Sequence, residues 1–471
     1  MSSTTTTTAM DTDLPAPQGT RHTLAAEEEL RLEVPFLKQS TCTILLQKGS
    51  CELWGLELVQ GKPHVLTDGG FQLAFFTWHG CVVDIDCENI DMAYTADETQ
   101  CNIAYVNTHA QLEALRDQAA PQSAQGPRVL ICGPTDTGKS SLFKILLAYA
   151  CKLGRTPCAV DLDVADNFLA IPGTLAACPL SYDALSLDTH ATSTGIPPGT
   201  AASLVLWHGS TTATAELYKA QVTALAAKVE ARLQTDALER ASGVIVNTAG
   251  TKQGDLDLLL HAIVALSITV VLVMGDDRLY SMLKSKVGGS GSSSDATTAT
   301  KVIKLPRSGG VVTRETSFLR QSRIRAVKRY FYGGLVEAPN STKRVPELTP
   351  FLLQLPTDQI TIYKFTSVSL SASLLPVAAM QTTEAVQLEQ VDLSDTAAAT
   401  SALEQHLLAV CHPRAVTKYQ ESGQASDLYL SGVAGFCSVE RLVDDRIHLL
   451  SPCTGSLPSN VLLIGDVTWM E

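Results

Sequence analysis

Apolar and polar residues alternate along a series of short segments between residues 29 and 107. Such alternation is typical of half-buried β-strands, and Gly and Pro residues separate the segments. The spacing predicts a small β-sandwich or barrel. Its predicted strands include residues 29–34, 43–46, 51–56, 72–78 and 81–85. A helix around residues 109–118 and an Ala/Pro/Gln/Gly-rich stretch at 119–127 then lead into the next part of the chain.

After residue 127, apolar runs alternate with segments of helical periodicity. This alternation predicts an α/β fold with a mainly parallel sheet that binds ligands at the carboxyl ends of its strands. The predicted strands are 128–132, 157–162, 203–207, 243–247 and 268–274, and the predicted helices are 140–153, 214–241 and 254–266. The run from Leu256 to Met274 is long enough to cross a membrane, but Asp257 and His261 interrupt it. A helix followed by a buried strand explains it better, so we expect no membrane association.

The chain returns to strand-like runs after residue 334, at 359–365, 428–438, 447–450 and 461–467. The predicted organisation is therefore a central α/β domain between an N-terminal β domain and a small C-terminal α/β domain. The predicted boundaries are a disordered tail at 1–24, domains at 25–118, 119–335 and 336–471, and a flexible Gly/Ser-rich insertion at 287–301.

Composition narrows the classes of function. The 471 residues carry a formal net charge of −13, which argues against a uniformly basic nucleic-acid-binding surface while leaving room for a local basic groove. The 12 cysteines form no C-x-x-C pair and no zinc-type cluster, so we expect mostly buried free thiols in a reducing compartment. The first 23 residues are mostly polar, and we expect no signal peptide.

Residues 133–140 have the pattern G-x-x-x-x-G-K-S between a predicted buried strand and a predicted helix. In that context the backbone N–H groups of the loop wrap a polyphosphate and Lys139 reaches the β- and γ-phosphates. The hydroxyl of Ser140 then binds Mg²⁺. The motif predicts that the chain binds a nucleoside triphosphate.

An acidic residue at the end of a neighbouring strand is needed to hold Mg²⁺. The strand at 157–162 ends with Asp161 and Asp163, of which Asp163 is the stronger candidate, while Asp161 is a candidate to orient an attacking hydroxyl. Residues 314–329 concentrate Arg and Lys side chains, which either clamp phosphates or form the solvated face of a helix, the latter interpretation being favoured for Arg323 and Arg325.

Several further motifs together resemble a known family. They are residues 29–34, 76–81, 105–109, 126–140, 171–174, 208–212, 277–280, 308–314, 330–333 and 450–452. With them the chain resembles the Clp family subunit of the pre-mRNA cleavage and polyadenylation machinery, in the polynucleotide 5′-hydroxyl kinase superfamily. The resemblance covers almost everything beyond about residue 24 and implies a three-domain protein in the nucleus.

The resemblance also implies roles for individual residues. ATP would lie between the first two domains, with Glu29 and Gln72 at the adenine. The phosphates would be held by the loop residues Asp136, Thr137, Gly138, Lys139, Ser140 and Ser141. Arg314 would be a lid arginine that closes over the transferring phosphoryl group, beside Lys139 and Asp163. Thr211 and Thr212 would line a groove for an RNA end.

The chain departs from active RNA kinases of this superfamily at three positions. Thr251 stands where a Trp stacks on the terminal base, Asp166 stands where Gln is typical, and Leu319 stands at the second lid arginine, with Arg320 one residue late. We therefore expect an ATP-binding subunit that bridges other pre-mRNA cleavage factor subunits. The alternatives are an active RNA 5′-hydroxyl kinase of tRNA splicing or RNA repair and, with less support, a ribosome-biogenesis kinase.

Overall fold

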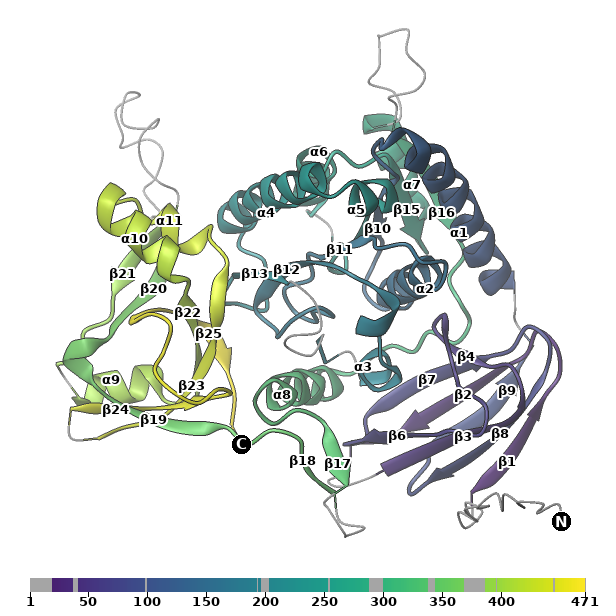
Figure 1. The fold of residues 1–471 in the computed structure, drawn as a ribbon, viewed down its shortest axis with the longest axis horizontal. Helices are drawn as coiled ribbons and strands as arrows, with labels where there is room; N and C mark the ends of the chain where they lie inside the picture. The colour runs from purple at the N-terminus through teal and green to yellow at the C-terminus, as the bar shows by residue number, and fades with distance from the viewer. Residues whose placement is uncertain are drawn as a thin grey trace, which may run out of the picture.

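The computed structural model consists of three parts, each built around its own β-structure (Figure 1). It describes residues 19–36, 41–97, 100–192, 194–195, 203–252, 255–287, 300–337, 344–367, 386–394, 396–443 and 445–470. Residues 1–18 and most of the Gly/Ser-rich segment predicted to be flexible lie outside the described residues.

The N-terminal part is a sandwich of two antiparallel sheets, as the alternating pattern predicted. One sheet has the order β1 (Thr20–Leu24), β8 (Cys81–Cys87), β3 (Thr41–Gly49) and β6 (Pro63–Thr67). The other has the order β5 (Leu56–Glu57), β4 (Glu52–Leu53), β7 (Phe71–Phe76), β2 (Glu29–Val34) and β9 (Met92–Ala96). Inward-facing side chains such as Leu30, Ile44 and Phe75 form the core between the sheets.

The expectation of disorder up to residue 24 is wrong for the last residues of that segment. Strand β1 pairs with β8 along its whole length, from Thr20 opposite Ile85 to Leu24 opposite Cys81. Backbone pairing and the burial of Leu24 fix this strand despite its polar sequence.

The central sheet has the order β13 (Leu204–Trp207), β12 (Thr174–Pro179), β11 (Cys158–Asp161), β14 (Val244–Asn247), β10 (Arg128–Cys132), β15 (Val270–Met274) and β16 (Lys301–Leu305). Strands β11, β14, β10, β15 and β16 are parallel to one another, which confirms the predicted mainly parallel sheet. Strand β12 runs in the opposite direction, because it pairs antiparallel with both of its neighbours, β11 and β13. Because the carboxyl ends of parallel strands share one edge, the loops after β10 and β11 lie close together.

Helices cover both faces of this sheet. Helices α1 (Gln100–Ala119) and α2 (Lys139–Lys152) pack on one face, and α4 (Ala215–Thr235), α6 (Leu256–Ala265) and α7 (Asp277–Lys286) pack on the other. The short helices α3 (Leu187–Thr192) and α5 (Ala237–Ser242) complete this part. The single helix predicted at 214–241 is interrupted because Asp236 caps α5, accepting hydrogen bonds from the N–H groups of Leu238 and Glu239.

The C-terminal sheet has the order β19 (Phe351–Pro356), β24 (Arg446–Ser451), β23 (Val433–Val443), β22 (His406–Cys411), β25 (Val461–Thr468), β20 (Thr361–Ser367) and β21 (Val386–Gln390). Its helices are α9 (Thr396–Leu403), α10 (Pro413–Ser422) and α11 (Ser426–Tyr429), and a small hairpin, β17 (Leu335–Glu337) with β18 (Arg344–Pro346), precedes it. The strand predicted at 428–438 begins only at Val433 because residues 426–429 form α11.

Helix α8 (Thr316–Tyr332) lies between the N-terminal and C-terminal parts and contacts both (Figure 1). Its buried Arg325 donates hydrogen bonds to the carbonyl oxygens of Gly69 and Gly70 in the N-terminal sandwich. At its other end Phe331 stacks on Trp469 of the C-terminal part, with the ring centroids 5.2 Å apart and the ring planes 12° apart. The helix therefore fixes both outer parts to the central one.

Candidate nucleotide site

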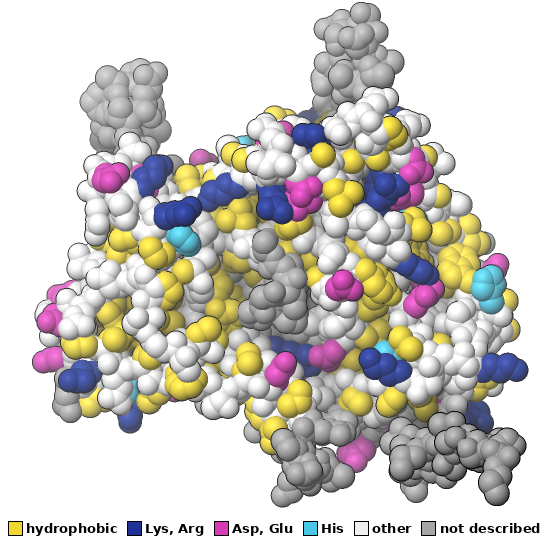
Figure 2. Space-filling model, viewed as in Figure 1, with side chains coloured by type: hydrophobic (Ala, Val, Ile, Leu, Met, Phe, Trp, Pro, Cys, Tyr) yellow, Lys and Arg dark blue, Asp and Glu magenta, His cyan; other side chains and the backbone are white. Residues whose placement is uncertain are grey.

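A cavity of about 750 Å³ lies where the N-terminal sandwich, the central sheet and α8 meet. Its walls include the predicted phosphate loop, the loop after β11, one face of the N-terminal sandwich and the segment leading into α8. On the face of the molecule shown in Figure 2, basic and acidic side chains are interspersed rather than gathered by sign.

The phosphate loop folds as its sequence requires. Strand β10 is buried along its length, and α2 begins at Lys139, so the N–H groups of the first turn of α2 lack an intrahelical acceptor. A side chain at Gly133, whose φ is +152°, would place its Cβ 2.4 Å from the carbonyl oxygen of Met274. Gly138 has φ +87°, and a Cβ there would lie 3.2 Å from Val311. The backbone of the loop is therefore compact and concave, and it favours glycine over residues with a side chain at these two positions.

Lys139 is 6% exposed and points back across the loop, where its Nζ donates a hydrogen bond of 2.7 Å to the carbonyl oxygen of Pro134. Burial lowers the pKa of this ammonium group, and the carboxylate of Asp163 partly opposes that effect. An anion placed in the loop favours the charged form of the lysine. The ammonium group of Lys139 therefore lies at the cavity wall, where it can bind phosphate oxygens.

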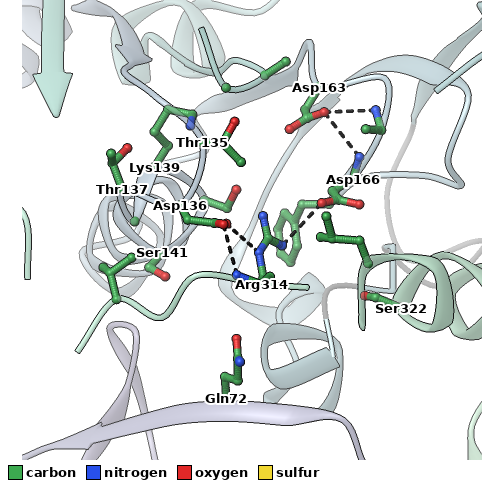
Figure 3. Close-up of a pocket in the computed structure, with 18 of the residues that line it drawn as sticks. Gln72, Thr135, Asp136, Thr137, Lys139, Ser141, Asp163, Asp166, Arg314 and Ser322 are labelled. Carbon is green, nitrogen blue, oxygen red and sulfur yellow. Dashed lines mark hydrogen bonds and ion pairs between the residues drawn. The ribbon is translucent and has the colours of Figure 1, made fainter. Parts of the chain in front are cut away.

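Asp163 lies at the cavity wall (Figure 3), and its Oδ1 accepts hydrogen bonds from the N–H groups of Ala165 (2.9 Å) and Asp166 (3.3 Å). Burial raises the pKa of Asp163, and the nearby Asp166 adds to the increase. A bound cation lowers that pKa again, as expected of a magnesium ligand.

Asp161, the other candidate, is fully buried and does not line the cavity. Its carboxylate accepts hydrogen bonds from the N–H groups of Asp163 and Phe168 and from Nδ2 of Asn247. Burial raises its pKa to about 7. Its contacts tie β11 to β14 and shape the loop, so the role of orienting an attacking hydroxyl does not fit this position.

Arg314 crosses the cavity between the phosphate loop and the loop after β11 (Figure 3). Its Nε donates to Oδ1 of Asp136 at 2.8 Å, its backbone N–H donates to Oδ2 of the same residue at 3.1 Å, and its Nη1 reaches Oδ2 of Asp166 at 3.3 Å. These carboxylates raise the pKa of Arg314 despite its burial. The structure thus brings the predicted lid arginine into contact with the predicted phosphate loop.

The interpretation of Arg323 and Arg325 as a solvated helix face is wrong. Arg323 lines the cavity, where its Nε donates to Oδ1 of Asp166 at 3.3 Å. Arg325 is buried and ties α8 to the N-terminal sandwich. Leu319 also lines the cavity, one helical turn before Arg323, whereas Arg320 is exposed. Arg323 therefore brings a basic side chain to the cavity one helical turn after Leu319, on the same face of α8.

The opposite end of the cavity belongs to the N-terminal sandwich. Glu29 and Gln72 both line it, and Gln72 points into it from β7 (Figure 3). The carboxylate of Glu29 accepts a hydrogen bond of 2.7 Å from Nε of the neighbouring Arg31, and both side chains are buried. Thr211, Thr212 and Thr251 line the same cavity, so the structure gathers the candidate residues from all the predicted elements.

Lys144 is a cavity residue that the sequence patterns did not single out. It lies one turn after the phosphate loop on α2, is 3% exposed and donates a hydrogen bond of 2.6 Å to the carbonyl oxygen of His190. Its Nζ lies 4.3 Å from the ring centroid of Trp54, which belongs to the N-terminal sandwich. Burial, with Arg325 and Arg314 nearby, lowers the pKa of Lys144 to about 7. The sequence does contain a signal for this residue, because Lys144 lies on the apolar face of the predicted helix.

These residues fit a polyphosphate with a divalent cation. The loop offers backbone N–H groups, Lys139 and Arg314 supply positive charge, and Oδ2 of Asp163 accepts no hydrogen bond from the described residues. Within the described chain no group of three or more His, Cys, Asp or Glu side chains is placed to hold a metal by itself. Mg²⁺ suits such a site because it binds through one or two protein ligands together with phosphate oxygens and water.

Comparisons with known proteins agree with this arrangement. Three family models match successive parts of the chain: "N-terminal beta-sandwich domain of polyadenylation factor" at residues 23–119, "mRNA cleavage and polyadenylation factor CLP1 P-loop" at 133–333, and "Pre-mRNA cleavage complex II protein Clp1" at 348–471. The "Protein CLP1 homolog" of Anopheles gambiae is 33% identical over 465 residues, which cover 98% of this chain and 99% of that protein. The chain belongs to the Clp1 family.

Other members of the Clp1 family show the same extent of similarity. The Homo sapiens protein named "Polyribonucleotide 5'-hydroxyl-kinase Clp1" is 32% identical over 459 residues, covering 96% of this chain and 97% of that protein. A solved Clp1p chain from a wild-type Clp1p–Pcf11p complex matches with a TM-score of 0.76 and 20% identity, over 97% of this chain and 99% of that chain. At that identity the match concerns the fold. In the described part of this Clp1 family chain, no helix is long and apolar enough for a membrane crossing.

Proposed function

We propose that this protein binds ATP and Mg²⁺ in the cavity and acts in the nucleus as an ATP-binding subunit of the pre-mRNA 3′-end cleavage and polyadenylation machinery, where it bridges other cleavage factor subunits. The observation that carries the proposal is the phosphate loop, with its two required glycines and buried Lys139, at the wall of a cavity shared by two parts of the chain. Membership of the Clp1 family supplies the biological setting.

Each wall of the cavity has a distinct task in this proposal. Glu29 and Gln72 contact the nucleobase end, and the backbone of residues 136–141 holds the phosphates. Ser140 and Asp163 hold Mg²⁺, which neutralises phosphate charge when bound. The positive charge of Lys139 and Arg314 faces the phosphate chain. Because the ligand contacts both the sandwich and the central part, it also stabilises their junction.

The proposed partners are protein subunits. The solved Clp1p chains that share this fold were determined with Pcf11p, and one of them is described for its extended interface with Pcf11p and for loss of ATP in a point mutant. That description links nucleotide and partner in a protein of the same fold. For the present chain we propose the same link, with the nucleotide as a structural ligand.

The alternative function is an active RNA 5′-hydroxyl kinase, the activity that names the human relative. Thr251 weighs against it. Its backbone N–H donates to the carbonyl oxygen of Gly133 at 3.0 Å, which places the residue beside the phosphate loop, but its side chain offers no aromatic face for a base. Base–aromatic stacking contributes about 1–3 kcal/mol, so RNA should bind weakly here.

Nucleotide binding is tested by heating the purified chain with and without Mg-ATP. A ligand bound only by the native state raises the melting temperature by mass action. We expect a clear increase for the wild-type protein and for Lys219→Ala, which alters a half-buried lysine of α4 that lies outside the cavity and pairs with Asp257. Lys139→Ala should abolish most of the increase. Nucleotide released on denaturing the purified chain should be ATP, and a protein that neither carries nor binds ATP would refute the proposal.

Radiolabel transfer from ATP to RNA with a 5′-hydroxyl separates the two functions. The structural-subunit proposal expects transfer at background level in the wild-type protein. Robust transfer that disappears in Lys139→Ala would replace it with the kinase. The result of the transfer assay does not change how the ATP-binding measurement is interpreted.

A further inference from the structure

Asp166 faces both cavity arginines at once. Its Oδ2 accepts from Nη1 of Arg314 and its Oδ1 accepts from Nε of Arg323, each at 3.3 Å, so each carboxylate oxygen meets one guanidinium group. The three side chains remain 23%, 32% and 31% exposed respectively, which leaves them open to a ligand in the cavity. A carboxylate between two guanidinium groups occupies the kind of position that a phosphate oxygen takes.

The two arginines come from different elements and are held from behind. Arg314 precedes α8 and is fixed by Asp136 of the phosphate loop, through its Nε at 2.8 Å and its backbone N–H at 3.1 Å. Arg323 belongs to α8 and also donates to the carbonyl oxygen of Ala165 at 3.1 Å. Both guanidinium groups therefore keep their places when Asp166 is neutralised. An arginine has five N–H donors, so each retains donors for a further acceptor.

The charge balance shows what Asp166 does to a ligand. Arg314, Arg323 and Lys139 line the cavity together with Lys144 and Arg325, and Asp136 and Asp163 oppose their charge. Asp166 adds a negative charge beside both arginines and so weakens their attraction for phosphate, whether or not its side chain rotates away. The same contacts stabilise the ligand-free protein by separating two like-charged guanidinium groups.

The geometry points to Asp166 as an internal counter-ion at the cavity arginines Arg314 and Arg323, one that the phosphate chain of the bound nucleotide has to compete against. The inference rests on the proposed function. It goes beyond it by assigning Asp166 as a residue that acts through Arg314 and Arg323 and limits affinity for the end of the phosphate chain.

Asp166→Asn tests this because the amide keeps the shape and the backbone N–H bond to Asp163 and removes only the charge. We expect the melting temperature of the ligand-free variant to fall, while its affinity for ATP increases about tenfold, which corresponds to about 1.4 kcal/mol. The gain should decrease from ATP to ADP and vanish with adenosine. Asp166→Glu should restore wild-type behaviour.

Arg323→Gln should weaken ATP binding and leave adenosine binding unchanged. Arg320→Gln, an exposed arginine on the same helix, is the matched control and should change neither. In the double variant Asp166→Asn with Arg323→Gln, the gain from the aspartate change should shrink, because one of the two cations that Asp166 neutralises is gone.

The outcomes separate the inference from the proposed function. If Asp166→Asn lowers both the ligand-free melting temperature and ATP affinity, Asp166 is only structural and the inference is overturned. An equal gain for ATP and adenosine overturns it as well. A wild-type protein that binds no nucleotide contradicts the proposed function. In that case an increase in melting temperature with Mg-ATP that appears only in Asp166→Asn supports the inference. The absence of an increase in both the wild type and Asp166→Asn overturns it.

Discussion

Lys144 gives a sharp test of how the cavity is built. Lys144→Met replaces a buried ammonium group with an apolar chain of similar length. In the native protein burial lowers the pKa of Lys144 from 10.5 to about 7. At about 1.4 kcal/mol per pH unit, this difference corresponds to about 5 kcal/mol between the charged and neutral forms, an upper figure because contacts with Trp54 and Phe168 favour the charge.

The sign follows from proton binding. Between pH 7 and 10.5 the unfolded chain holds a proton on Lys144 that the native protein has lost, so the stability of the native state rises with pH. Below pH 7 both states are protonated and this dependence disappears. Relative to Lys144→Met, the wild-type protein should therefore gain up to about 1.4 kcal/mol of stability per pH unit above pH 7.

The assay is urea unfolding of the nucleotide-free protein at pH 7, 8 and 9, comparing the wild type with Lys144→Met. Lys152→Met, on the same helix but exposed, is the control and should track the wild type. A difference between wild type and Lys144→Met that stays constant from pH 7 to 9 would refute the reasoning. It would mean that the hydrogen bond to His190 and the two aromatic rings fully offset the burial of the ammonium group.

Four further predictions concern the fold and the loop. Gly133→Ala should abolish the melting-temperature increase with Mg-ATP, because its Cβ would collide with a carbonyl oxygen and the loop would have to move. Burial lowers the pKa of His190 to about 3, so the stability of the native state falls as the pH drops from 6.5 towards 3. His190→Leu should reduce this loss of stability, which is measured by unfolding both proteins between pH 4 and 7. Phe331→Ala should destabilise the protein by about 3–5 kcal/mol, seen by calorimetry, because the ring is fully buried. Deleting residues 1–24 should lower the melting temperature because β1 is lost, whereas deleting residues 1–18 serves as the control.

The phosphate loop could be predicted from the sequence because its chemistry depends on consecutive residues. Lys139 and Ser140 are fixed by the motif itself, and the structure places them at the cavity wall. The choice between Asp161 and Asp163 was less certain, since both follow the same strand. Asn247, on a neighbouring strand, donates to Asp161 and holds it in the core, whereas Asp163 lies at the cavity wall.

The missed features depend on residues that are distant in sequence. Strand β12 (Thr174–Pro179) has the composition of a loop or a helix, and its antiparallel pairing with β11 fixes it as a strand. Arg323 was interpreted as a solvated residue because a periodic pattern does not show which helix face meets a cavity. Its role follows from Asp166, a residue 157 positions away in the sequence.

Helix α8 has a consequence for dissecting the protein into fragments. This one helix carries Arg325, which hydrogen-bonds the N-terminal sandwich, Arg323, which lines the cavity, and Phe331, which packs in the C-terminal core. Any truncation that removes it strips a buried partner from two neighbours at once, and any truncation that keeps it alone exposes those groups to water. The three parts should therefore express and purify poorly as isolated pieces, and work on this protein is best done on the undivided chain.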